Sequence, residues 1–332
     1  MDSAAHDPIP RATPMTHFDV FNGDADGLCA LHQLRLAAPK ESVLVSGVKR
    51  DVALLQRVAG EAGDSVTVLD ISMAVNRRAL LALLDRGVHV EYFDHHYAGD
   101  IPQHPNLTAV IDPSPGLCTG MLVDRHLGGR FRIWAAVAAF GDNLPREADA
   151  LVQPLPLSAS QRDQLRELGE SLAYNGYGDV EADLIVHPAA LYRTLHKHAD
   201  PFEFIRCEPI YRTIRDRRRA DLERARLAKP AHELAGAVVY ILPDEPWSRR
   251  VRGALANELV QRFPSLATAV LTRNAQGGYT VSLRTPSGKG IDADALCRKF
   301  ATGGGRVTAA GINHLPQERL PEFVRDLDHA FS

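Results

Sequence analysis

The stretch FDVFNGDADGLCALHQLRLAA, residues 18–38, has the pattern of a short strand, a glycine-flanked loop and a helix. FDVF is apolar enough for a buried strand, and LCALHQLRLAA has the length and apolar spacing of a helix. The loop carries two carboxylates, Asp24 and Asp26, one residue apart. A turn explains the glycines and one aspartate, but it does not require two acids where a strand ends. The stretch therefore predicts a strand, loop and helix unit whose acidic loop has a chemical role.

The same alternation of short apolar runs and helical stretches continues to about residue 142. The further predicted strands are SVLVSGV (42–48), SVTVLDIS (65–72), HVEYFDHH (89–96) and LTAVID (107–112). Strands separated by helices of this length predict a parallel sheet with helices on both faces. A helical region follows from 145, and a second, smaller α/β unit begins at GAVVYILP (236–243). It is expected to end with a helix near DADALCRKF, the segment ATGGGRVTAAG (301–311) and a final helix from about 316.

The composition bounds the class of protein. The 332 residues are 45% hydrophobic, enough for a core in each of two domains, and the formal net charge is −3. We find no apolar run long enough to cross a membrane and no signal peptide, and we expect residues 1–15 to form a disordered tail. The four cysteines match no metal-binding spacing and favour a reducing, cytoplasmic location.

One segment is strongly basic. Residues 206–229 contain nine Arg or Lys and four acids. A polyanion-binding patch and the solvated face of a connecting helix both fit this pattern, and we favour the connecting helix because linkers are usually charged.

Polar side chains lie where the predicted strands and helices end. These residues are Asp24, Asp26, Asp70, Asp94, His95, His96 and Asp142. In parallel sheets such ends form the ligand-binding edge. Several carboxylates converging there would raise each other's pKa unless cations neutralised them. Oxygen-rich sites with one or two imidazoles suit Mn²⁺ or Mg²⁺, and this many acids suggest two ions about 4 Å apart that promote displacement at phosphorus.

Four motifs carry a family resemblance. FNGDADGLCA (21–30), VLDIS (68–72), FDHH (93–96) and AAFGDN (138–143), in this order, resemble the signature motifs of the DHH phosphoesterase superfamily. That superfamily includes RecJ-like exonucleases, nanoRNases that also dephosphorylate pAp, cyclic-dinucleotide phosphodiesterases and exopolyphosphatases. The stretch IDADALCRKFATGGGRVTAAG (291–311) resembles the DHH-associated substrate-binding domain. The resemblance implies a DHH catalytic domain at 16–200, a helical linker at 201–235, a substrate-binding domain at 236–332 and an active site in the cleft between the domains.

The resemblance also implies a set of metal ligands. Asp24 and Asp70 would hold the first ion, and Asp26, Asp70, His95 and Asp142 would hold the second. Asp70 would then bridge two ions, with Mn²⁺ expected and Mg²⁺ as the alternative. A hydroxide shared between the ions would be the nucleophile, since two positive charges lower the pKa of water.

Further roles follow for residues beside the metals. The predicted catalytic residues are Asp70, Asp94, His95 and His96. His96 would face the scissile phosphate, and Asp94 would orient a histidine by accepting its other N–H. The predicted substrate-binding residues are Arg284, Gly303, Gly304, Gly305 and Arg306. We expect the glycines to let backbone amides at the start of a following helix approach a phosphate, and the arginines to donate charge-assisted hydrogen bonds.

The chain departs from the family pattern at three positions. Many members have a His four residues before the first Asp of the opening motif, where this chain has Val20, and RecJ-like members have an Asp at the position of Asn22. The first ion is then expected to use Asn22 or water as a ligand. Arg306 follows the glycine run where a His is usual, which retains a phosphate donor but removes a titrating group.

These observations predict an enzyme. We expect a metal-dependent phosphoesterase that hydrolyses short oligonucleotides or small nucleotides such as pAp, since the chain leaves no room for the nucleic-acid-binding domain of processive RecJ-like exonucleases. The alternatives are a cyclic- or linear-dinucleotide phosphodiesterase, an exopolyphosphatase and, outside enzymes, a degenerate nucleotide- or nucleic-acid-binding module. No membrane partner is expected, and assembly as a homodimer is left open.

Overall fold

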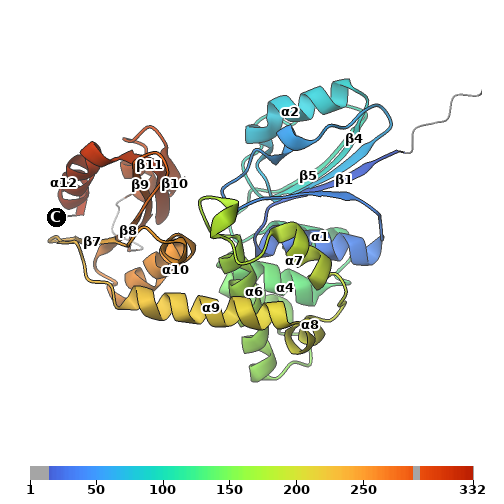
Figure 1. Cartoon of the computed structure of the whole chain (residues 1–332). Helices are drawn as coiled ribbons and strands as arrows, with labels where there is room; N and C mark the ends of the chain where they lie inside the picture. The colour runs from blue at the N-terminus through green and yellow to red at the C-terminus, as the bar shows by residue number, and fades with distance from the viewer. Residues whose placement is uncertain (1–14, 287–291, 332) are drawn as a thin grey trace, which may run out of the picture.

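The N-terminal part is built on a five-stranded parallel sheet. The computed structural model describes residues 15–286 and 292–331, so the expected tail lies almost entirely outside the described residues. The strand order is β2-β1-β3-β4-β5, and every neighbouring pair is parallel. The strands are β1 His17–Phe21, β2 Val43–Val45, β3 Ser65–Leu69, β4 His89–Asp94 and β5 Leu107–Ile111. The five predicted strands and their parallel arrangement are therefore confirmed (Figure 1).

Helices cover both faces of this sheet. On one face lie α2 (Met73–Asp85) and the short helix η1 (Leu54–Arg57), over a core that includes Val20, Val68 and Tyr92. On the other lie α1 (Ala25–Ala37) and α3 (Thr119–His126), over a core that includes Phe21, Leu69 and Phe93. Consecutive strand residues thus pack into the cores on opposite faces of the sheet, as the two-residue period of a strand requires. A sheet buried on both faces explains why these strands are almost continuously apolar.

A helical region follows and extends the core beneath α1. Its elements are α4 (Arg132–Gly141), α5 (Pro145–Val152), α6 (Ala159–Gly176), η2 (Glu181–Asp183), α7 (Pro188–Leu195), α8 (Pro201–Cys207) and α9 (Pro209–Arg226). None of the helices in the described ranges is long and apolar enough to cross a membrane.

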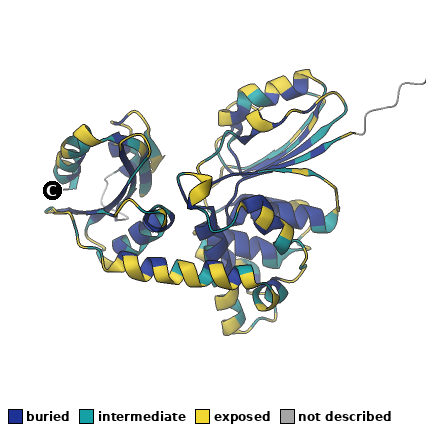
Figure 2. Cartoon of the chain, in the orientation of Figure 1, coloured by how far each residue is buried: buried dark blue, intermediate teal, exposed yellow. Residues whose placement is uncertain are grey.

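The basic segment is the connecting helix α9. Its inner face packs against α6 and α10 (Pro246–Arg262), and its outer face is exposed (Figure 2). Acids of both flanking helices pair with its arginines: Arg218 with Glu170, Arg219 with Glu167, and Arg226 with Glu258. The segment is therefore a salt-bridged connecting helix, the interpretation favoured from its charge pattern.

The C-terminal part contains a six-stranded mixed sheet in the order β10-β11-β9-β8-β7-β6. Its strands are β6 His232–Glu233, β7 Ala237–Ile241, β8 Ala267–Arg273, β9 Gly278–Arg284, β10 Gly303–Arg306 and β11 Ala309–Pro316. Only β7 and β8 pair in parallel among these strands. The remaining helices are α11 (Ala293–Cys297), η3 (Gln317–Arg319) and α12 (Leu320–Phe331). This unit confirms the smaller α/β domain expected at the C-terminus.

The prediction that the glycine run is followed by the start of a helix is wrong. Residues 303–306 form strand β10, which pairs with β11 as an antiparallel hairpin. The glycines serve close packing there, because a Cβ on Gly303 would lie 1.7 Å from the carbonyl oxygen of Cys297, and one on Gly305 would lie 2.4 Å from Cα of Ala310. Backbone approach is still the reason for glycine, but the partner is the chain itself.

The two parts share one apolar core. A single cluster of buried residues runs from α1 and α4 through α6 and α9 to α10, and it includes Leu28, Leu172, Leu222 and Leu255. The second sheet has its own cluster on its other face, between β7 to β11 and α11 and α12. Packing across α9 and α10 therefore joins the two sheets through one continuous core.

Candidate functional site

The acids predicted from the motifs converge beyond the carboxyl ends of β1, β3 and β4. Asp24 is the N-cap of α1, and its Oδ1 accepts the backbone N–H groups of Asp26 and Gly27. Asp70 directly follows β3 and Asp94 ends β4. Asp142 follows α4, whose last turn packs against α1. All but Asp142 are 3% exposed or less, so this is a buried acidic cluster.

His95 is the centre of this cluster. Its Nε2 lies 3.5 Å from Oδ1 of Asp70, 3.9 Å from Oδ2 of Asp26 and 3.9 Å from Oδ2 of Asp142. Two ligands of one ion at about 2.1 Å lie at most about 4.2 Å apart, so all three distances suit a shared ion. One ligand atom from each of Asp70, His95 and His96 also lies within 4.8 Å of the others. These residues form a candidate His/Asp metal site.

The electrostatics of the carboxylates favour a bound cation. Burial and then the charges of Asp26 and Asp24 raise the pKa of Asp70 well above its usual value. Burial also raises the pKa of Asp26, with Asp142 and Asp24 adding to the effect against the opposing charge of His95. A divalent ion would remove this repulsion, which is the physical reason for placing one there.

Two backbone features hold the acids in place. Both carboxylate oxygens of Asp26 accept backbone N–H groups at the start of α3, from Thr119 and Gly120, at 2.7 Å each. Asp70 has a φ of 59°, and among the described residues only Asn143 shares a positive φ outside glycine. Left-handed backbone is costly for such residues and persists where the surroundings impose it, often at functional sites.

The Asp94 and His96 pair has the geometry expected of an oriented histidine. Nδ1 of His96 lies 2.7 Å from Oδ1 of Asp94. Burial lowers the pKa of His96, but the hydrogen bond and charge of Asp94 outweigh it, and the pKa lies above its usual value. Since Asp94 occupies Nδ1, Nε2 is the nitrogen available to a ligand.

The two atypical positions of the opening motif have other uses in this fold. Val20 is fully buried in the core beneath α2. The side-chain amide of Asn22 donates to the carbonyl oxygen of Lys49 at 3.2 Å, while its Oδ1 is buried without a hydrogen-bond partner among the described residues.

Lys49 itself is a site residue that the motifs did not identify. Its Nζ lies 2.5 Å from Oδ2 of Asp24 and 3.4 Å from Oδ1 of Asp142. Burial raises the pKa of Asp24, but Lys49 reverses this effect, so that the pKa lies below its usual value. Burial would lower the pKa of Lys49, but Asp24 and its neighbours hold it well above its usual value. Lys49 follows the end of β2. Ligands of parallel sheets bind beyond the ends of strands, and this position was the one signal in the sequence that could have identified Lys49 as a site residue.

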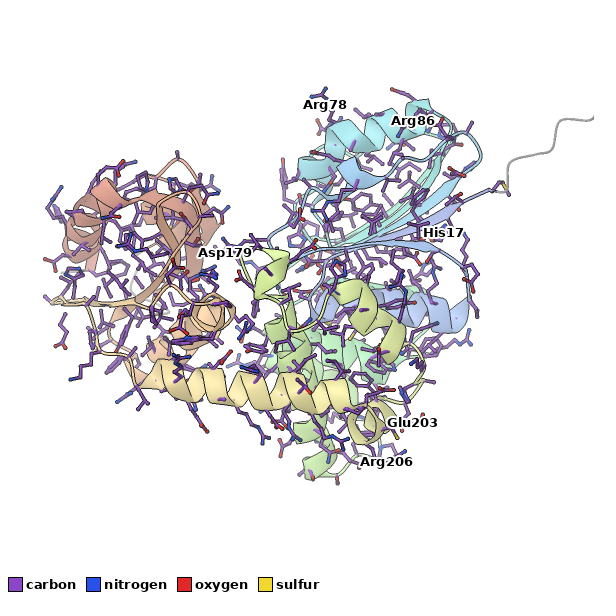
Figure 3. All side chains as sticks on the ribbon, in the orientation of Figure 1. His17, Arg78, Arg86, Asp179, Glu203 and Arg206 are labelled. Carbon is purple, nitrogen blue, oxygen red and sulfur yellow. The ribbon has the colours of Figure 1, made fainter. Side chains whose placement is uncertain are left out.

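A cleft between the two parts opens onto this cluster. Its volume is about 710 Å³, and it contains both histidines and Asp142. Its cationic lining residues are Lys49, Arg50, Arg249, Arg252, Arg284 and Arg306. At the boundary of the two parts, Asp179 pairs with Arg50 and Arg252 (Figure 3). A cleft with six cations beside an acidic cluster is suited to an anion that approaches a metal centre.

The predicted substrate residues divide by position. Gly304, Gly305 and Arg306 line the cleft, whereas Gly303 is not among its lining residues. The amide of Gly305 already donates to Oδ1 of Asp294 at 2.6 Å. Arg284 donates to Oδ1 of Asn257 at 2.6 Å, and the Arg306 side chain makes no hydrogen bond or ion pair to another described residue. Arg306 is thus the cleft arginine most accessible to a ligand.

Comparisons with known proteins agree with this architecture. Residues 234–332 match the family described as the DHHA1 domain. No curated protein matches the sequence. Exonuclease RecJ bound to manganese aligns with a TM-score of 0.62 and 18% identity, covering 95% of this chain and 89% of that one. RecJ from Thermus thermophilus in complex with Mn²⁺ has a TM-score of 0.61 and 20% identity, covering 95% of this chain and 51% of that one.

A phosphodiesterase matches over nearly its whole length. The pGpG-specific phosphodiesterase PggH from Vibrio cholerae aligns with a TM-score of 0.54 and 16% identity, covering 95% of this chain and 98% of that one. A further Thermus RecJ structure contains Mg²⁺. Structures with this fold therefore hold Mn²⁺ or Mg²⁺.

Fold and site together define the architecture: a parallel sheet with a candidate His/Asp metal centre, joined through helices to a mixed sheet. In particular, residues 234–332 of this chain match the DHHA1 domain family, and the whole chain has the RecJ-like fold.

Proposed function

We propose that this protein is a metal-dependent phosphoesterase that hydrolyses a P–O bond in a short oligonucleotide or a small nucleotide. The observation that carries the proposal is the position of His95, within 3.9 Å of three carboxylates at the floor of a cationic cleft. A divalent ion bound there would supply Lewis acidity and lower the pKa of a coordinated water.

The protein's own residues would bind and orient the substrate. Arg306 would donate to a phosphate oxygen from the DHHA1 side of the cleft, and Arg284, fixed by Asn257, would add a second positive charge. His96, held at Nδ1 by Asp94, would present Nε2 to the phosphate beside the metal ligands. This division places binding in one part of the chain and chemistry in the other.

A dinucleotide phosphodiesterase is the second candidate. PggH, a phosphodiesterase specific for pGpG, is matched over 98% of its length. The exopolyphosphatase and the non-catalytic binding module remain alternatives, the latter because Val20 and Asn22 replace ligands that the family resemblance implies.

One assay separates these candidates. The purified full chain is incubated with Mn²⁺ and one candidate substrate at a time. The substrates are labelled di- to pentanucleotides, pAp, cyclic and linear dinucleotides, and polyphosphate. We expect turnover of the short nucleotides, and loss of that turnover in Asp70→Asn but not in Asp100→Asn, which neutralises an exposed carboxylate outside the cluster. Binding of a nucleotide without turnover of any substrate would favour the binding module and refute the enzyme.

A further inference from the structure

The Lys49 ammonium lies inside the acidic cluster. Besides Asp24 and Asp142, it contacts the ring of Tyr177, whose centroid is 5.5 Å from Nζ. Two carboxylates and an aromatic face therefore surround the charge, a favourable environment for an ammonium group. The side chain is 34% exposed, so it remains accessible from the cleft.

The backbone around Lys49 is fixed to the opening motif. The Lys49 amide donates to the carbonyl of Gly176 at 2.8 Å, while Asn22 binds its carbonyl oxygen. Ser46 donates to the carbonyl of Phe21 at 2.8 Å. A Cβ on Gly23 would lie 2.0 Å from the carbonyl oxygen of Gly47, so glycine allows the two loops to approach this closely. The position of Lys49 is thus determined by the motif loop.

Both oxygens of Asp24 are engaged by this arrangement. Oδ1 accepts the two N–H groups that begin α1, and Oδ2 contacts Nζ of Lys49. Val20 and Asn22, the other positions that would complete a site around Asp24, pack in the core and hold the Lys49 backbone respectively. Lys49, and neither Val20 nor Asn22, is therefore the residue whose side chain contacts Oδ2 of Asp24.

We propose that Lys49 takes the place of the first of the two ions, so that the protein binds a single divalent ion at the His95 side of the cluster. This inference rests on the proposed function, because it concerns how that metal centre is composed. The ammonium neutralises Asp24 with one positive charge and supplies N–H donors, but it cannot coordinate water. Lys49 would then be a positioning residue that acts through Asp24 and Asp142.

Metal stoichiometry tests the proposal without reference to activity. The full chain is stripped with EDTA, saturated with Mn²⁺, desalted and analysed for manganese per chain, with isothermal titration for affinity. We expect one ion in the wild type and in Lys49→Arg, which keeps the charge, and a second, weaker equivalent in Lys49→Ala, which exposes Asp24. Arg50→Ala removes the neighbouring cation, which pairs with Asp179 and not with Asp24, and should still bind one ion.

The outcomes are distinct. Two ions per wild-type chain would overturn the inference, since Lys49 would have to move aside and Oδ1 of Asn22, which has no hydrogen-bond partner among the described residues, would be the candidate ligand. An unchanged stoichiometry in Lys49→Ala, with its thermal unfolding intact, would also overturn it. No bound Mn²⁺ in the wild type would refute the metal-dependent function itself, whereas a single ion with no hydrolysis would leave this inference standing and the proposed activity refuted.

Discussion

Arg250 joins the C-terminal part to the helices beneath the N-terminal sheet, and its replacement should destabilise the whole protein. From α10 it donates to the hydroxyl of Tyr174 at 2.8 Å, to the carbonyl of Asp183 at 2.7 Å and to Oδ2 of Asp221 at 2.7 Å. Arg250 is 8% exposed and Asp221 6%. Arg250→Met would keep much of the side-chain volume but leave the Asp221 carboxylate buried with the Tyr174 hydroxyl alone, at a cost of about 3–5 kcal/mol.

Urea unfolding at neutral pH measures this loss as a change in the free energy of unfolding. The matched control is Arg226→Met, which breaks an exposed pair with Glu258 and should cost less than about 1 kcal/mol. Adding Asp221→Asn to Arg250→Met removes the unpaired carboxylate charge and should recover at least about 1 kcal/mol of the free energy of unfolding. If Arg250→Met cost no more than Arg226→Met, the buried contact would not hold the two parts together and the reasoning would be refuted.

Three further outcomes are expected. Burial raises the pKa of Asp19, but hydrogen bonds from His17 and Arg35 lower it from 3.8 to about 2. The ionised carboxylate should therefore contribute about 2 kcal/mol to the free energy of unfolding above about pH 4. That contribution is lost as the pH falls from about 4 towards 2, and the stability difference between wild type and Asp19→Asn, followed by urea unfolding, should shrink by this amount. Arg306→Ala should raise KM at least about tenfold with little change in kcat; a pure kcat effect would contradict its role in binding. Gly303→Ala should destabilise the protein by more than about 1 kcal/mol because the Cβ would collide with backbone, and a neutral result in thermal unfolding would show that the β10 hairpin can shift.

The first sheet could be predicted well from the sequence because each of its strands is marked by a pattern within the strand itself. Apolar runs such as those ending at Phe21, Leu69 and Phe93 mark strands buried on both faces, and strand ends in a parallel sheet share an edge. The acids that follow those strands could therefore be placed together before any contact was known. Their convergence around His95 required the fold, because Asp142 comes from a helix rather than a strand.

The features that the sequence did not predict depend on contacts between distant segments. Gly303, Gly304 and Gly305 carry no side-chain pattern, and they form a strand because β11 is available as a partner. Lys49 belongs to no motif, and it reaches Asp24 only because the loop after β2 packs on the loop after β1. A local pattern cannot encode either partner, so propensity and motif matching leave both undetermined.

The continuity of the core has a consequence for how the cleft selects its ligand. Domains that meet through small polar interfaces move relative to one another, whereas a large apolar interface resists such motion. Here the apolar cluster passes without interruption from α6 through α9 to α10, and Arg250 adds a buried polar contact across the same junction. The side of the cleft that carries Arg306 is therefore joined to the His95 side through this core. Under the proposed function, a cleft held in this way should distinguish ligands by the spacing of their phosphates from the bond to be cut, so short substrates should be ranked by length rather than by base.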